Sequence, residues 1–102
     1  MARKRPHVEE DLLPIFGHPL RRTLLKFCLE ATEPVSPKRL SELTDHPLSN
    51  VSYHVRVLAK SGAIEIVAER PVRGSTEHFY EVAPLVKATP WVQAALGLPA
   101  KD

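Results

Sequence analysis

The residues of this sequence best suited to chemistry are the polar side chains between positions 48 and 64. They carry hydroxyl, amide, guanidinium and ammonium groups and are Ser49, Asn50, Ser52, Tyr53, Arg56 and Lys60. Such groups hydrogen-bond to base edges and to phosphate oxygens, whereas carboxylates repel phosphates. The chain has 12 acidic residues, yet none lies between His46 and Ile64. The stretch therefore predicts a surface for double-stranded DNA. The alternative is that these groups only solvate an exposed face.

Helical spacing separates these polar groups from the apolar residues of the same stretch. Val51, Val55 and Leu58 fall at i, i+4 and i+7 and form one apolar stripe, which predicts a helix over about residues 47–61. Ser49, Tyr53, Arg56 and Lys60 then fall on the opposite face of this helix. A helix with one face for a core and the other carrying hydrogen-bonding groups suits the DNA major groove.

Three further candidates lie on or near this helix. His54 falls at its flank, between the apolar stripe and the polar face. Two interpretations of His54 stay open: it bonds a phosphate, or it packs as a hydrogen-bonded histidine. Lys38 and Arg39 stand at the start of the preceding predicted helix, which crosses the DNA backbone in helix-turn-helix proteins. Ordinary surface charge explains these two residues equally well.

A basic β-hairpin is predicted after the helix. Residues 63–68 are rich in β-branched side chains, and residues 76–82 alternate in polarity. The six residues 69–74 between them carry two arginines, a proline and a glycine, which predicts a loop with a basic tip. The candidates for minor-groove or phosphate contact at this tip are Arg70, Arg73, Gly74 and Ser75. The alternative is that they only make a soluble turn.

The other elements complete one domain over residues 8–98, between a flexible basic arm at 1–7 and a tail at 99–102. The patterns predict helices near 9–16, 18–31 and 36–43, and a broken helical tail over 84–98. Ser36 followed by Pro37 begins the third of these helices, in which Leu40 and Leu43 face inward. Helix, helix, turn, helix and hairpin make a winged helix-turn-helix, a mainly α fold class with a small β-hairpin.

Composition is that of a soluble globular protein, with 43% hydrophobic and 25% charged residues. The net charge is only +2, so the prediction of a nucleic-acid partner depends on the local acid-free stretch. Cys28 is the one cysteine and cannot form an internal disulfide. It lies on the apolar stripe of its helix, so we expect a core residue rather than a redox switch. The sequence has neither a bilayer-spanning run nor a signal peptide, which predicts a cytoplasmic protein without membrane contact.

Other kinds of chemistry find little support in the sequence. The five histidines lack metal-ligand spacing, so we expect neither a metal nor another cofactor. A catalytic triad, a carboxylate pair and a phosphate loop are all unrecognisable, so we do not expect an enzyme. Two other functions stay open as alternatives. One is a winged-helix module that docks proteins, and the other is a sensor repressor gated by a small-molecule effector in a dimer interface.

Three motifs resemble those of ArsR-type transcriptional regulators. Residues 40–62, with Val-Ser-Tyr-His-Val-Arg-Val-Leu at their centre, resemble the family pattern Val-Ser-x-His-Leu-x-x-Leu-x-x-x-Gly. Residues 18–25, His-Pro-Leu-Arg-Arg-Thr-Leu-Leu, resemble its opening helix. Residues 73–80, Arg-Gly-Ser-Thr-Glu-His-Phe-Tyr, resemble the wing of actinobacterial winged-helix regulators. The resemblance covers roughly residues 18–83.

The resemblance implies a homodimeric bacterial regulator whose terminal helices form the dimer interface. Apolar residues that the helix-turn-helix core does not need are candidates for this interface: Leu12, Leu13, Phe16, Trp91, Val92 and Leu96. Metal-sensing members carry a Cys-x-Cys pair where residues 41–44 read Ser-Glu-Leu-Thr. Their C-terminal helix supplies Asp, His and Glu as metal ligands, and residues 84–98 contain none of the three. The resemblance therefore implies a member without a metal site.

Overall fold

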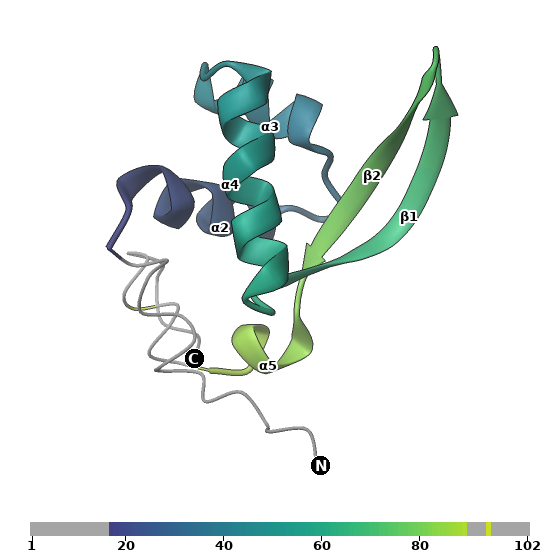
Figure 1. Ribbon diagram of the computed structural model, residues 1–102. Coiled ribbons are helices and arrows are strands. Elements are labelled where there is room, and N and C mark those ends of the chain that lie inside the picture. Colours follow the sequence, from purple (N-terminus) through teal and green to yellow (C-terminus); the bar gives the residue numbers. More distant parts are fainter. Residues whose placement is uncertain (1–16, 90–93, 95–102) are drawn as a thin grey trace, which may run out of the picture.

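The computed structural model describes residues 17–89 and Ala94. Its elements are α2 (Pro19–Glu30), α3 (Pro37–Thr44), α4 (Leu48–Lys60), β1 (Ile64–Val72), β2 (Ser75–Val82) and α5 (Pro84–Lys87). Figure 1 shows α2, α3 and α4 gathered together and the β1–β2 hairpin reaching away from them. The predicted fold class, a winged helix-turn-helix with a small β-hairpin, is confirmed. The basic arm, the helix predicted over residues 9–16 and the tail over 99–102 lie outside the described residues.

The bounds of α3 follow from residues at its two ends. Ser36 caps the helix, because its side-chain oxygen accepts a hydrogen bond from the backbone N–H of Arg39 at 3.2 Å. Pro37 takes the first turn, where a missing N–H leaves no hydrogen bond unmade. Asp45 ends the helix in the left-handed conformation, with φ 56°. The start predicted at Ser36-Pro37 is therefore confirmed.

Gly62 ends α4, also as predicted. Its φ of 87° lies in the left-handed region, which glycine enters without steric cost. The N–H of Gly62 donates to the carbonyl of Ala59 at 3.1 Å, and the N–H of Ala63 donates to that of Leu58 at 3.0 Å. These two bonds make a Schellman motif, which satisfies the last carbonyls of the helix. The chain then turns directly into β1.

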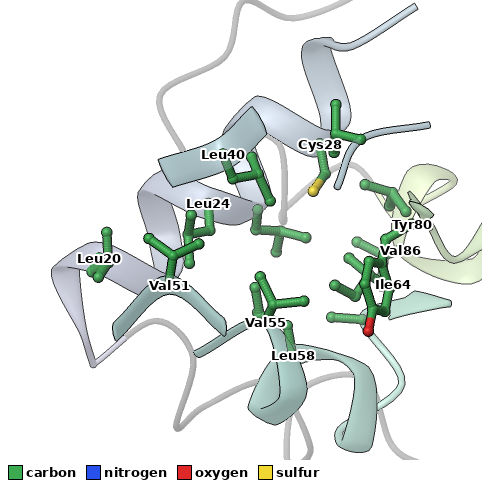
Figure 2. Packing of buried hydrophobic residues seen from close by; sticks show 14 residues of the cluster. Leu20, Leu24, Cys28, Leu40, Val51, Val55, Leu58, Ile64, Tyr80 and Val86 are labelled. Atoms are coloured by element: carbon green, nitrogen blue, oxygen red, sulfur yellow. The ribbon is translucent and has the colours of Figure 1, made fainter. Parts of the chain in front are cut away.

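The core lies where the three main helices meet the base of the hairpin (Figure 2). The predicted stripe of α4 is fully buried, with Val51, Val55 and Leu58 at 0% exposure. The other elements add Leu20, Leu24, Leu25, Cys28, Leu40, Ile64, Tyr80, Val82 and Val86. Burying one such side chain stabilises the fold by about 1.5–3 kcal/mol. The helix-turn-helix is thus held by one apolar cluster, from which the polar face of α4 points away.

Two interior predictions have different outcomes. Cys28 is buried as expected, and desolvation raises the pKa of its thiol to about 12, so it behaves as a core hydrophobe. The prediction that Leu43 faces inward is wrong, because 39% of this residue is exposed. Leu43 lies in the last turn of the short helix α3, one turn beyond buried Leu40, and lines a surface hollow with Phe79.

The hairpin is longer and its turn tighter than predicted. The strands pair from Ile64↔Val82 to Val72↔Ser75, which leaves only Arg73 and Gly74 in the turn. The six-residue loop predicted over residues 69–74 is therefore wrong. Pro71 lies inside β1, which is an edge strand because β2 is its one neighbour in the described two-stranded sheet. Edge strands tolerate proline, so its presence did not mark a loop.

Candidate nucleic-acid interface

The outward face of α4 carries the polar residues that its spacing predicts. Five of them are exposed, namely Ser49, Asn50, Tyr53, Arg56 and Lys60, and Ser52 is half-buried. Tyr53 exposes 52% of its surface, a large fraction for an aromatic residue. Acidic residues are absent throughout α4. The result is a polar, partly cationic helix face backed by the core.

The first turn of α3 adds two cations beside α4. Lys38 and Arg39 are both exposed. The guanidinium of Arg39 lies 3.4 Å from Glu42, with side chains 60% and 54% exposed. An exposed ion pair of this kind contributes little and is screened by salt, so Arg39 can change partner at low cost. The two residues occupy the position that their sequence predicted.

A groove of about 580 Å³ lies between the start of α3, α4 and the hairpin. Lys38, Arg56 and Arg70 supply its positive charge, and Glu77 is the acidic residue on its wall. The other residues that line it are Pro37, Leu48, Ser52, Val55, Val72, Ser75, Thr76, His78 and Tyr80. The groove therefore brings together five predicted site residues from three separate segments. The other exposed candidates stand outside it, in the first turn of α3, on the open face of α4 or at the hairpin turn.

Arg70 does not lie at the hairpin tip, where the sequence predicted it. It belongs to β1 and pairs in register with Glu77 on β2. Its Nη2 donates a hydrogen bond to Glu77 Oε1 at 2.6 Å, and its guanidinium lies 5.6 Å from the centroid of the Phe79 ring. The longer strands explain this correction. Arg73 and Gly74 make the turn instead, and Gly74 takes φ 64°, a conformation that suits glycine.

The structure resolves the two interpretations of His54 in favour of packing. Only 6% of His54 is exposed, and its Nδ1 accepts a hydrogen bond from Arg21 Nε at 3.0 Å. The ring of His18 lies 4.4 Å away, between centroids. Desolvation by burial, then the charges of His18 and Arg21, lower the pKa of His54. A phosphate contact by His54 does not fit so buried a ring, which instead joins α4 to the start of α2.

Glu77 is the functional candidate that sequence reasoning missed. Its side chain is only 14% exposed and faces both Arg70 and the groove. Its position within the wing motif at residues 73–80 was the available signal. Its pairing with Arg70 follows from the register and the two-residue turn, neither of which the sequence patterns predicted.

Other kinds of site have little to build on in the described part of the chain. Among residues 17–89 and Ala94, no group of three or more His, Cys, Asp or Glu side chains is arranged to hold a metal ion. The helices in this same part are all too short or too polar to cross a bilayer. The six residues predicted for the dimer interface lie outside the described residues, so the interface stays a prediction.

These features define the class: a winged helix-turn-helix protein with a cationic groove between its helices and its wing. The family described as "Helix-turn-helix domain" matches residues 16–67, and the chain belongs to this family. A search of curated proteins finds no match.

Solved structures share the fold. A transcriptional regulator homologue protein from Pyrococcus horikoshii OT3 is 18% identical, with a TM-score of 0.63 over 88% of this chain and 86% of the other. A possible transcriptional regulator from Methanosarcina mazei Go1 is 15% identical, with a TM-score of 0.59 over 95% and 82%. Reduced HlyU from Vibrio cholerae N16961 is 20% identical, with a TM-score of 0.54 over 87% and 81%. At such identities the likeness concerns the fold alone.

Proposed function

We propose that this protein is a transcriptional regulator that binds specific sequences of double-stranded DNA. The observation that carries the proposal is the acid-free, exposed face of α4 beside a cationic groove. A helix of this width fits the major groove, and its hydroxyl, amide and guanidinium groups match the donors and acceptors of base edges. The family match and the fold shared with proteins described as transcriptional regulators support the same class of function.

The proposed contacts divide into two kinds. Base readout is assigned to the outward residues of α4, which are Ser49, Asn50, Tyr53 and Arg56. Phosphate contact is assigned to the surrounding cations and small polar groups, which are Lys38, Arg39, Ser52, Lys60, Arg70, Arg73, Gly74 and Ser75. Phosphate contacts supply affinity for any duplex, and base contacts supply the choice of sequence.

The finer part of the proposal is a homodimer of ArsR type without a metal site. One recognition helix covers a short footprint, so a single copy binds weakly and selects poorly. Two copies related by a two-fold axis present two helices about 34 Å apart, one DNA turn, and read an inverted repeat. The motif resemblance and the surplus apolar residues near both ends of the sequence support this assembly.

The experiment that tests the proposal is selection of bound sequences from random duplex DNA with the full chain, followed by a salt titration on the enriched duplex. We expect enrichment of an inverted repeat and an affinity that falls linearly with salt on logarithmic axes. Failure to enrich any sequence, together with salt-independent binding, would contradict a DNA-binding regulator. Specific capture of a protein by the α4 face in its place would favour the interaction module.

A further inference from the structure

Glu77 is an acidic side chain in a groove that otherwise favours anions. It lines this groove beside Lys38 and Arg70, with 14% of its side chain exposed. A carboxylate at such a place repels phosphates and lowers the affinity for any duplex. A residue that opposes binding in this way needs another role, which its contacts supply.

The main contact of Glu77 is with Arg70 on the opposite strand of the hairpin. Across the hairpin, Glu77 accepts a hydrogen bond from Arg70 at 2.6 Å, and the ring of Phe79 lies under the same guanidinium. Hydrogen bonds from Arg70 and then from the hydroxyl of Ser36 hold the pKa of the Glu77 carboxyl below its ordinary value. Ser36 is also the residue that caps α3. Glu77 therefore contacts the opposite strand through Arg70, and it lines a second surface hollow together with Ser36 at the start of α3.

We propose that Glu77 is a positioning residue for DNA recognition, which fixes the direction of Arg70. The inference rests on the DNA binding proposed above. A guanidinium held in one direction meets only duplexes whose shape places a phosphate or base edge before it. A guanidinium that is not held can reorient and contact the phosphates of a duplex of any sequence. Glu77 thus lowers general affinity and raises selectivity.

Glu77→Gln separates this role from simple charge repulsion. The amide keeps the shape of the side chain but loses the charge that holds the guanidinium. Repulsion alone predicts that an enriched duplex and a scrambled duplex of equal composition both bind more tightly, in an unchanged ratio of affinities. Positioning predicts that the scrambled duplex binds at least as tightly as before, while the ratio falls at least about fivefold. A fivefold change corresponds to about 1 kcal/mol of lost discrimination.

Glu81→Gln is the matched control. Glu81 lies on the same strand, is exposed, and pairs in register with Glu65 rather than with a cation. Its substitution removes the same charge and leaves the contacts of Arg70 intact. We expect the ratio of affinities to stay within about twofold of the wild-type ratio, the usual effect of an independent site. All duplexes are compared at one salt concentration, because salt alone changes affinity.

Two further variants keep the test decisive. Glu77→Asp retains the charge, but its side chain is one methylene shorter and no longer reaches Arg70 in the same geometry. Positioning therefore predicts a lower ratio of affinities, whereas repulsion predicts an unchanged ratio. On an Arg70→Gln background, Glu77→Gln should change the ratio no more than Glu81→Gln does. Thermal unfolding identifies the variants that fold. A wild-type ratio in both folded Glu77 variants would overturn the inference. Failure of the wild-type protein to prefer the enriched duplex would instead overturn the proposed function.

Discussion

At the scale of single residues, the proposed recognition depends on side chains that contribute little to folding. Arg56 and Tyr53 project from α4 away from the core, whereas Val51 and Val55 are fully buried on the opposite face. Substituting an outward residue therefore leaves no cavity. Binding and stability can be changed separately, which makes the α4 face open to a clean test.

Arg56→Ala is expected to weaken binding to the enriched duplex, because guanidinium makes bidentate contacts with guanine. The loss of discrimination should be about 1–3 kcal/mol, measured by fluorescence anisotropy against a scrambled duplex. Lys26→Ala on α2, which removes a cation outside the groove, is the control and should leave discrimination unchanged. Equal effects of the two substitutions would remove this face of α4 from base recognition.

Single residues differ in how far the sequence could predict them. The burial of Val51, Val55 and Leu58 follows from helical period alone, and the structure agrees. The partner of Glu77 does not follow in this way. It depends on strand register, which a bulge between Ile66 and Ala68 and the length of the turn decide together. Cross-strand contacts of this kind have no signature within either segment.

At the scale of elements, the contact between α2 and α4 decides how the recognition helix is held. The bond from Arg21 to His54 Nδ1 requires that this nitrogen carry no proton. Burial and the neighbouring charges also favour the neutral ring. Protonation of His54 would break the bond and place a new charge beside Arg21. The packing of the recognition helix therefore depends on pH.

The expected result is a loss of stability on acidification. The folded-state pKa of His54 lies below its ordinary value of 6.5, so the unfolded chain takes up the proton first as pH falls. Stabilisation by the neutral ring is complete above about pH 6.5 and is lost as pH falls through that value toward the lower folded pKa. Thermal unfolding at pH 7.5 and 5.5, at fixed protein concentration, measures this loss.

Two substitutions identify the source of the pH dependence. His54→Gln should reduce the difference in unfolding temperature between the two pH values. His46→Gln, in the exposed turn before α4, should leave it as in the wild type. These pH values lie above the ordinary range of carboxyl pKa values, so carboxylates contribute little. If the His54 variant loses as much unfolding temperature between pH 7.5 and pH 5.5 as the wild type does, the proposed role of the Arg21–His54 contact is contradicted.

Helix ends were more predictable than the hairpin. Ser36-Pro37 and Gly62 carry local signals that act within one turn of helix, and both ends are where the sequence places them. The meaning of Pro71 depends on its neighbours. Proline is excluded from a central strand and then indicates a loop, but an edge strand tolerates it. Which strand is the edge is a property of the sheet.

Arg73→Ala tests the hairpin as a phosphate-binding element. The residue lies in the two-residue turn, at the end of the hairpin farthest from the core. We expect a weaker affinity for all duplexes and a salt dependence reduced by about one unit of slope, since one phosphate contact is lost. A change in sequence preference at constant slope would mean that the turn reads bases instead.

At the scale of the whole molecule, we expect selective binding to need two copies of α4, the proposed recognition helix. A chain of 11.4 kDa offers one such helix, and the proposed homodimer offers two. The apolar residues proposed for the interface lie outside the described part of the chain. The assembly could be predicted only from surplus hydrophobicity and motif resemblance, because one folded chain does not contain the contacts that join it to another.

Light scattering tests this assembly. We expect about twice the mass of one chain at tens of micromolar, and a shift toward the single-chain mass when Trp91 and Leu96 are both changed to Gln. Changing Thr23 and Glu30 on the exposed surface of α2 to Gln is the control and should keep the larger mass. A single-chain mass in the wild type, with tight binding at one half-site, would contradict the homodimer.

The central claim is that the outward face of α4 and the hairpin together contact DNA. Amide chemical-shift changes on adding the enriched duplex to ¹⁵N-labelled protein test it most directly. We predict the largest changes at residues 49–60 and 70–75, and small changes at the exposed residues of α2. Large changes on α2 with an unperturbed α4 would contradict the account.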